Sequence, residues 1–319
     1  MVREVLPQVP GFRILRRLGA GARGTVYEAI QDETERAVAL KLFEPMDEPD
    51  AALPEEVEHE RRVAASLRHR NLVRIHAMGE HGQRRWLASE YLPGGSLAER
   101  MGKALAPARA LEILRDLARG LGHAHARGVI HGDVKPGNVL FRGMQGSGEA
   151  VLVDFGAAVW LHNGAARAAG GTPGYMSPEQ ARGEPIDARS DFYSLGVVLY
   201  EMLTRHLLPH APSQAALARG MADLPAPVQW LRPLFDALLA QDPSDRPADA
   251  RALLALLESL QAASPEATEV LPGTADWDLH QRIHGVAMPR PLWHRRGALL
   301  LLSAAVLAAL ALALWSGSS

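Results

Sequence analysis

Asp133, Lys135, Asn138 and Asp154 have the side-chain types and the spacing that phosphoryl transfer requires. The first three lie in the run HGDVKPGN at 131–138, and the fourth begins DFG at 154–156. A phosphoryl-transfer site needs a carboxylate that holds the acceptor hydroxyl, a cation on the transferred phosphate and two oxygen ligands for magnesium. These four side chains can supply all of those groups, so this stretch is the candidate catalytic centre.

A second candidate element is the glycine-rich run GAGARGTV at 19–26, which contains Gly19, Gly21 and Gly24. Glycines let backbone N–H groups come close to a polyphosphate, because no Cβ stands in the way. An ordinary hairpin turn would also explain this run, and a following helix would suggest a dinucleotide-binding fold. Here a strand with the sequence VALK follows at 38–41, which favours a lid over nucleotide phosphates with Lys41 as a phosphate ligand.

The elements that must position these residues form two parts. Alternating apolar and polar residues predict strand, turn and strand over 12–42, and a further short strand at 86–91. Apolar residues at helical spacing predict a charged helix at 54–69, whose carboxylates could hold Lys41. The same periodicity predicts later helices at 110–127, 191–204, 228–239 and 248–260. The expected fold class is therefore α+β, with a small β-rich lobe ahead of a larger helical lobe.

Composition excludes several classes of function. The chain has 319 residues, 47% of them hydrophobic, which is enough for a substantial core. Its formal net charge of −2 gives no sign of bulk nucleic-acid binding. The absence of cysteine excludes disulfides, thiol catalysis and zinc–thiolate sites. Residues 1–10 lack an apolar core of signal-peptide length, so cleavable secretion is not expected.

The C-terminal end predicts a membrane anchor. Residues 297–315 carry no charge and have about the 20-residue length that crosses a bilayer, although a buried core helix is the alternative. Arg290, Arg295 and Arg296 precede this stretch and no basic residue follows it, so the positive-inside rule keeps the N-terminal bulk in the cytoplasm. We therefore expect a single-pass protein of the inner (cytoplasmic) membrane, with a linker at 262–296, a transmembrane helix at 297–315 and an extracytoplasmic tail at 316–319.

Taken together, the motifs resemble those of bacterial serine/threonine protein kinases of the eukaryotic (Hanks) type, over a domain at 11–261. The resemblance implies a bilobal kinase fold, with one main helix in the small lobe, and the use of ATP and Mg²⁺ or Mn²⁺. It implies that Asp133 is the catalytic base or orienter and that Lys135 contacts the γ-phosphate. It makes Asn138 and Asp154 the metal ligands, and Gly156 the turn of the metal loop.

The same resemblance assigns the ATP pocket. Glu60 lies nine residues before His69, which is the spacing of the carboxylate that pairs with Lys41, and Glu56 is the alternative one helical turn earlier. Ser89 would guard the space behind the adenine, just before a hinge at 90–92. The implied nucleotide-binding residues are Leu18, Gly19, Gly21, Gly24, Val26, Ala39, Lys41, Glu90, Leu92 and Leu140.

Further resemblance lies downstream, in residues that position the site or the substrate. The run GTPGYMSPE at 171–179 is similar to the end of an activation segment, and Thr172 together with Lys135 resembles the Ser/Thr branch. Glu179 would form a buried ion pair with Arg246, and Asp191 would anchor the backbone of the catalytic loop. His125 would be structural, so a metal site built from His123, His125 and His131 is not expected.

Gly132 departs from the family pattern, because many members carry Arg there to bind a phosphate on the activation segment. The loop 157–170 contains no Ser, Thr or Tyr, so receptor and phosphoacceptor are both missing. We expect activity that does not depend on phosphorylation within this loop. Ser264, Thr268 and Thr274 in the linker are candidates for autophosphorylation, which self-association would allow.

Two alternatives remain beside a kinase that acts on Ser and Thr of proteins. The motif at 131–138 also resembles small-molecule (aminoglycoside-type) phosphotransferases, although these generally lack the GTPGYMSPE and Asp191 motifs. A catalytically inactive kinase that serves as a membrane-tethered scaffold is the other alternative. Magnesium-dependent transfer to proteins or to aminoglycosides separates the three.

Overall fold

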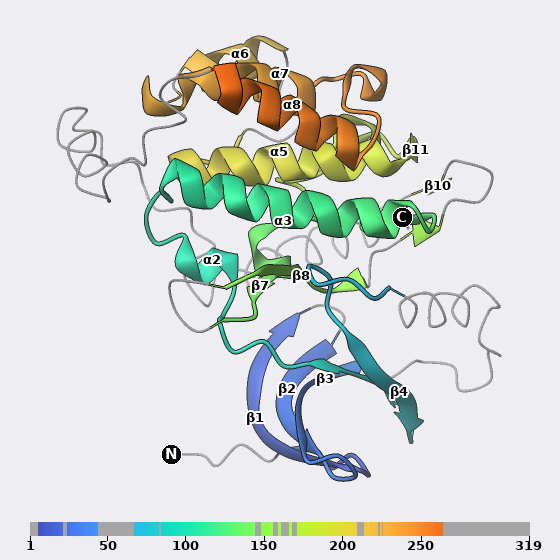
Figure 1. Ribbon diagram of the computed structural model, residues 1–319. Coiled ribbons are helices and arrows are strands. Elements are labelled where there is room, and N and C mark those ends of the chain that lie inside the picture. The colour runs from blue at the N-terminus through green and yellow to red at the C-terminus, as the bar shows by residue number, and fades with distance from the viewer. Residues whose placement is uncertain are drawn as a thin grey trace, which may run out of the picture. The chain divides into compact units, whose positions relative to one another are not determined.

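A computed structural model describes residues 6–21, 24–43, 67–82, 84–143, 148–155, 159–160, 166–167, 171–208, 214–222, 224 and 226–263. The chain divides into two compact units, Met1–Leu271 and Pro272–Ser319. All of the described residues belong to the first unit. Figure 1 shows its strands β1 to β4 at one end and its helices α3, α5, α7 and α8 at the other.

The N-terminal part is a five-stranded antiparallel sheet. Its strand order is β1-β2-β3-β5-β4. The strands are β1 (Phe12–Gly21), β2 (Gly24–Gln31), β3 (Arg36–Phe43), β4 (Ile75–His81) and β5 (Arg84–Glu90). The prediction of only two strands over 12–42 is wrong, because a second turn at 32–35 separates β2 from β3. Glu35 takes a φ of 50° in this turn, and the N–H of Thr34 donates to the carbonyl of Gln31.

One face of this sheet holds an apolar core and the other carries Lys41. Val38, Leu40 and Leu42 of β3 are buried in the core, with Phe12 packed edge-on against Trp86 at 4.8 Å between ring centroids. Because successive side chains of a strand point to opposite faces, Ala39 and Lys41 lie on the face away from this core. The strand pairing sets Ala39 opposite Ser89.

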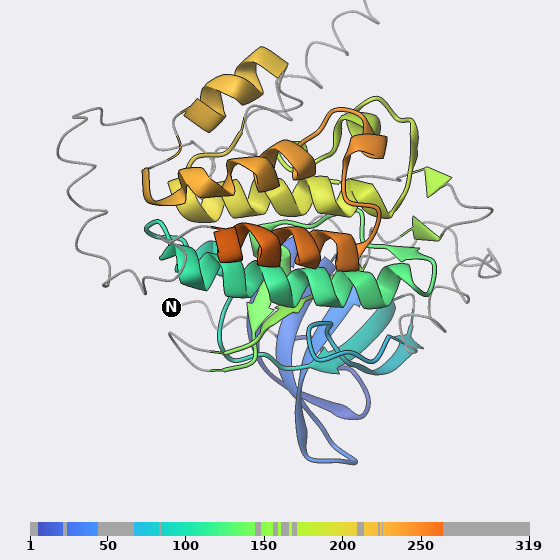
Figure 2. The same cartoon turned by 45° about the horizontal axis from the view of Figure 1, so that its top comes forward.

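Helices make up most of the second part. They are α2 (Leu97–Arg100), α3 (Pro107–His125), α4 (Pro178–Ala181), α5 (Ala188–Thr204), α6 (Gln214–Ala222), α7 (Arg232–Leu238) and α8 (Ala250–Ala263). Figures 1 and 2 both show α5 and α8 lying along α3, and these helices are in contact. Thirteen of the 17 residues of α5 are buried, so this helix forms the centre of the helical part and can hold other elements in place.

The helices predicted at 110–127, 191–204 and 248–260 are confirmed as α3, α5 and α8. The single helix predicted at 228–239 is wrong, because a 3-10 helix (Ala226–Leu231) precedes α7 and Pro233 lies in the first turn of α7. The predicted helix at 54–69 lies mostly outside the described residues. Its predicted end is wrong: Leu67 to His69 are not helical, and the N–H of Leu72 donates to the carbonyl of His69 in a turn.

Among its described residues, the second part also contains three pairs of short strands, and the candidate site residues lie in the loops beside two of these pairs. β7 (Val139–Phe141) and β8 (Ala150–Leu152) form one antiparallel pair, and β6 (Val129–Ile130) pairs with β9 (Val159–Trp160). A third pair joins β10 (Ala166–Arg167) to β11 (Pro185–Ile186). Within the part of the chain that the structure describes, no helix is long and apolar enough to cross a membrane. The span predicted at 297–315 lies outside that part.

Candidate active site

Asp133 lies in the loop between β6 and β7 and is the centre of a compact polar cluster. The Lys135 ammonium is 2.6 Å from Asp133 Oδ2, and the Thr172 hydroxyl donates to Oδ1 at 2.7 Å. Lys135 also donates to the Thr172 hydroxyl at 2.6 Å. The segment 171–179 is thereby linked to the catalytic loop through the two residues that indicate the Ser/Thr branch.

Asn138 closes the same loop from its other end. It ends a 3-10 turn (Pro136–Asn138), and its amide nitrogen donates to the Asp133 carbonyl at 2.9 Å and to Asp133 Oδ2 at 3.2 Å. The N–H of Val153 donates to the Asn138 carbonyl at 2.9 Å. This bond brings Asn138 beside the residue that precedes Asp154, so the two predicted metal ligands come from adjacent backbone segments.

Asp154 joins the helical part to the sheet. Its Oδ1 is 2.7 Å from the Lys41 ammonium, across 113 positions of sequence. Its backbone has a φ of 62°, a left-handed conformation that costs a non-glycine residue about 1–2 kcal/mol. Such strain persists only where surrounding contacts fix it and is common at functional sites. Glu60 and Glu56, the predicted partners of Lys41, lie outside the described residues, as does Gly156.

The side chains around Asp133 fit a magnesium ion that a nucleotide helps to hold. No group of three or more His, Cys, Asp or Glu among the described residues could hold a metal ion. Magnesium is usually bound by one or two carboxylates together with phosphates of the substrate. Asn138 uses its amide nitrogen for both of its hydrogen bonds to Asp133, which turns its amide oxygen, the atom that a hard cation takes, the other way. Asp154 supplies the carboxylate.

Asp191 of α5 anchors the backbone of the predicted catalytic loop, residues 131–138. Its carboxylate accepts hydrogen bonds from the backbone N–H groups of His131 at 2.9 Å and Gly132 at 2.8 Å, and it is 2.7 Å from His125 Nε2. Burial by itself would raise the pKa of Asp191, but the hydrogen bonds from His125 and the Gly132 N–H, together with the charges of His125 and His131, outweigh it, so the pKa is lowered. The loop anchor expected from the sequence is therefore present.

Gly132 occupies a backbone position that suits glycine. Its φ is 73°, in the left-handed region that side chains with a Cβ disfavour. Its N–H is bound by Asp191, and its carbonyl accepts a hydrogen bond from Gln180 Nε2 at 2.9 Å. Sequence reasoning missed Gln180, although the spacing of Ser177 and Gln180 is a capping-box signal. This capping box stabilises the start of the short helix α4 and so positions the Gln180 side chain that contacts Gly132.

The glycine-rich run forms the end of the β1–β2 hairpin. Gly19 pairs with Val26 and Gly21 with Gly24 across the two strands. A Cβ on Gly19 or Gly21 would meet no atom within 4 Å, which leaves open space at both positions. A Cβ on Gly24, in contrast, would overlap the carbonyl oxygen of Leu42. Gly24 is therefore needed for close packing of β2 on β3, and Gly19 and Gly21 leave room for a ligand.

A separate apolar cluster lies around the β7–β8 pair and the start of the hinge. Buried Val73, Leu92 and Val151 form a cluster against which Leu140 packs, together with Val153 and Phe155. Ser89, 8% exposed, donates a weak 3.4 Å hydrogen bond to the carbonyl of Ala39. The assignment of Ser89 and Leu140 to the adenine space stays a prediction. Leu18 at the rim is partly exposed.

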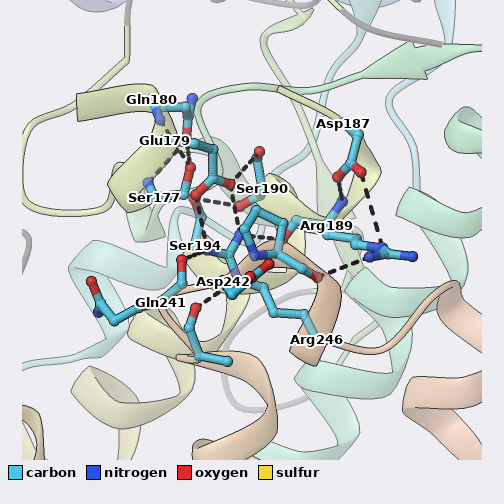
Figure 3. Close-up of polar contacts among 12 residues, drawn as sticks. Ser177, Glu179, Gln180, Asp187, Arg189, Ser190, Ser194, Gln241, Asp242 and Arg246 are labelled. Carbon is cyan, nitrogen blue, oxygen red and sulfur yellow. Dashed lines mark hydrogen bonds and ion pairs between the residues drawn. The ribbon is translucent and has the colours of Figure 1, made fainter. Parts of the chain in front are cut away.

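The ion pair expected between Glu179 and Arg246 is present and is buried (Figure 3). Arg246 donates to both carboxylate oxygens, at 2.6 and 2.9 Å, and Ser190 donates to Oε1 at 2.6 Å. Burial alone would raise the pKa of Glu179, but the hydrogen bonds from Arg246 and Ser190 lower it to about 2. Arg246 also donates to the carbonyls of Ala240, Gln241 and Arg189. The pair therefore holds α4 against α5 and the loop before α8.

The structure thus gathers most of the predicted residues in one place. Lys135, Asn138 and Thr172 each contact Asp133, and Asp154 contacts Lys41. Asp191 binds the backbone of the same loop. The roles of these residues in a reaction stay predictions. Glu60 and residues 22–23 of the glycine-rich run lie outside the described residues.

Comparison with known proteins identifies the family. The sequence pattern described as protein kinase domain matches residues 12–284. Serine/threonine-protein kinase PknL of Mycobacterium tuberculosis is 34% identical over 271 residues, which cover 80% of this chain and 67% of PknL. Serine/threonine-protein kinase pkn2 of Myxococcus xanthus is 35% identical over 280 residues, which cover 82% of this chain and 33% of pkn2. This chain therefore spans about a third of the length of one relative and two thirds of the other.

A solved structure agrees with this assignment. The PknI kinase domain of Mycobacterium tuberculosis superposes with a TM-score of 0.63 at 26% identity, over 80% of this chain and 98% of that domain. The match supports two lobes, a β-sheet lobe and a helical lobe, as the fold. The chain belongs to the protein kinase domain family, within which its relatives are bacterial serine/threonine protein kinases.

Proposed function

We propose that the chain is a membrane-anchored protein kinase that transfers the γ-phosphate of ATP to Ser and Thr hydroxyls of proteins. The observation that carries this proposal is the contact of Asp133 with both Lys135 and Thr172. Lys135 and Thr172 are the two residues that the sequence comparison with the kinase family associates with Ser/Thr kinases rather than tyrosine kinases. The names of the relatives support the same substrate class.

In this proposal the side chains act mainly by positioning and by charge. Asp133 accepts a hydrogen bond from the acceptor hydroxyl and directs its oxygen at the γ-phosphorus. The bond between that oxygen and phosphorus forms as the bond from phosphorus to the β,γ-bridging oxygen breaks, and the hydroxyl proton leaves through Asp133. Lys135 neutralises the transferred group, and Lys41 holds the α and β phosphates. Magnesium, held by Asn138 and Asp154, would neutralise charge on the phosphates.

Control of activity is part of the proposal. Gly132 offers no guanidinium to a phosphorylated loop, and 157–170 contains no hydroxyl-bearing side chain. Thr172, the first hydroxyl after this loop, is hydrogen-bonded to Asp133 and Lys135. We therefore expect activity without phosphate on the loop. Mass spectrometry of the active protein tests this: a phosphate on Thr172 that is present at full occupancy and is needed for activity would refute it.

The membrane anchor rests on the uncharged stretch 297–315 and the arginines that precede it. Tethering would raise the local concentration of the kinase near membrane-bound substrates and near other copies of itself. The expected location is the cytoplasmic membrane with the kinase domain in the cytoplasm. Fractionation of cells that express the full chain and a version ending at residue 296 tests this, since only the full chain should stay with the membranes.

Transfer of radiolabelled phosphate from ATP tests the activity itself. Purified protein is assayed with Mg²⁺ and, in parallel, with generic protein substrates and with aminoglycosides. Labelled Ser or Thr in protein supports the proposal, labelled aminoglycoside supports a small-molecule phosphotransferase, and no label supports a scaffold. An Asp133→Ala variant is the control, and label that persists in it would show that Asp133 is not the catalytic carboxylate.

A further inference from the structure

The hinge between the two lobes is held by two arginines that none of the catalytic motifs contains. The hinge begins at Glu90, the last residue of β5, and continues through Tyr91 and Leu92, the segment predicted to border the adenine space. Glu90 is bound by Arg142, which follows β7 in the helical lobe, and the Tyr91 hydroxyl is bound by Arg16 of β1. Two consecutive hinge residues are therefore tied to opposite lobes.

Arg142 makes five hydrogen-bond contacts through the three nitrogens of its guanidinium. Nη2 donates to both oxygens of Glu90 at 2.9 and 3.2 Å, and Nε donates to Glu90 Oε2 at 3.3 Å. Nη1 donates to Glu149 Oε2 at 2.9 Å and to the Arg70 carbonyl at 2.6 Å. A lysine has three donors on one atom and no planar fork, so it cannot reproduce this set. Contacts from all three nitrogens to three different residues indicate a fixed position rather than a mobile surface charge.

Arg142 acts at one end of the hinge while backbone bonds act at the other. The N–H of Gly94 donates to the Phe141 carbonyl at 3.1 Å, and the N–H of Phe141 donates to the Gly95 carbonyl at 3.2 Å. The segment from Glu90 to Gly94 is thus attached at both ends to β7 or to the residue that follows it. Leu140 of β7 and Leu92 of the hinge pack in one apolar cluster. The spacing between Leu92 of the hinge and Leu140 of β7 is therefore set by the attachments at the two ends of the hinge segment.

Arg16 provides the opposing attachment. Its Nη2 donates to the Tyr91 hydroxyl at 3.1 Å, and its Nε donates to Glu28 of β2 at 2.7 Å. β1 continues from Arg16 into Gly19 and Gly21, so the hinge is connected directly to the strand that forms the glycine-rich lid. Arg16 is 62% exposed, against 36% for Arg142. Because solvent weakens the more exposed contact, Arg16 should have the smaller effect.

We propose that Arg142, assisted by Arg16, is a positioning residue that sets the adenine-binding width of the hinge and thereby the affinity for ATP. This inference rests on the proposed use of ATP in this cleft. It differs from a merely structural role, because loss of the attachment should weaken nucleotide binding without changing the groups that carry out transfer. The KM for ATP should therefore change more than kcat.

The experiment compares five variants of the full chain, purified in detergent, by steady-state transfer and by calorimetric titration with ATP. Arg142→Gln should raise the KM and Kd for ATP about five-fold, with kcat within about two-fold of the wild type. Arg142→Lys should give KM and Kd values for ATP between those of the wild type and those of Arg142→Gln. Arg16→Gln should raise the KM for ATP about two-fold. The matched control is Arg85→Gln, which removes a cross-strand pair with Glu80 at 3.2 Å elsewhere in the sheet. It should change none of these constants.

The inference is wrong if Arg142→Gln leaves the KM and Kd for ATP unchanged. It is also wrong if the variant lowers only the melting temperature and kcat, because that result would assign Arg142 to folding. Glu149→Gln separates the two halves of the network, since it disturbs the β7–β8 connection and keeps the bond to Glu90. An increase in KM equal to that of Arg142→Gln would overturn the role of the hinge bond. A wild type that binds ATP without transferring phosphate would refute the proposed function and leave this test intact.

Discussion

Replacing Arg246 by Met is expected to destabilise the protein strongly, because it leaves the carboxylate of Glu179 buried without its counter-charge. The side chains of Arg246 and Glu179 are 0% and 3% exposed, and two hydrogen bonds join them. Methionine fills much of the same volume but offers no donor. Only Ser190 and backbone groups would then remain to bind the carboxylate.

The size of the effect follows from the pKa of Glu179. Lowering it from 4.5 to about 2 corresponds to about 3 kcal/mol of stability carried by the charged form. Because the folded-state pKa is depressed, this contribution is present above about pH 4.5 and is lost as the pH falls toward 2. Breaking a buried ion pair from one side typically costs 3–5 kcal/mol. We therefore expect Arg246→Met to lose about 3–5 kcal/mol at pH 7, and the loss to shrink in acid.

Urea unfolding followed by tryptophan fluorescence measures this loss at pH 7 and at pH 4. The matched control is Arg182→Met, which breaks a two-bond pair with Glu184 whose side chains are 52% and 48% exposed. That variant should lose no more than about 1 kcal/mol. The double variant Glu179→Leu with Arg246→Met should recover part of the loss, because no charge is left buried. If Arg246→Met loses no more than Arg182→Met, the reasoning is refuted.

Three further predictions concern the candidate site. Gly24→Ala should destabilise the sheet by about 1–3 kcal/mol in thermal unfolding, because its Cβ overlaps the Leu42 carbonyl, and Gly82→Ala in an open turn should cost less. Asp191→Asn should lower kcat and cost about 1–3 kcal/mol in urea unfolding, because its amide group cannot accept from His131 and Gly132 as the carboxylate does; an unchanged kcat would contradict the anchoring role. Thr172→Val should lower kcat about ten-fold or more in the transfer assay, and Thr172→Ser, which keeps the hydroxyl, should restore most of it.

Much of the fold could be predicted because its signals are local. The apolar spacing over 191–204 identifies α5, and Pro107 at the start of α3 agrees with helical periodicity there. Strand β4 was missed, and β2 was merged with β3. The turn between β2 and β3 contains no glycine or proline; it depends on Glu35 at a positive φ, which residue type alone does not indicate. Element boundaries therefore depend on backbone conformations that tertiary contacts stabilise.

The candidate site likewise has residues that the sequence could identify and contacts that it could not. The motifs at 131–138, 154–156 and 171–179 could be recognised, because a phosphoryl-transfer site requires particular residue types at particular spacings. The ion pair of Glu179 with Arg246 also followed from the motifs. The bond between Lys41 and Asp154 did not, and neither did the bond from Gln180 to Gly132. Each of these contacts depends on how two separately formed elements meet.

The sequence by itself determined which groups are available for chemistry: the carboxylates, cations and amide of the motifs and the positions of the glycines. The tertiary structure decided which charges meet. Thirty-four Lys and Arg and 36 Asp and Glu offer many pairings of opposite sign, and residue type does not choose among them. The ion pair of Arg142 with Glu90 depends on the fold, because residues 52 positions apart in the sequence must be brought together. Charge pairing falls off steeply with distance in water, so the packing of elements selects the pairs that matter.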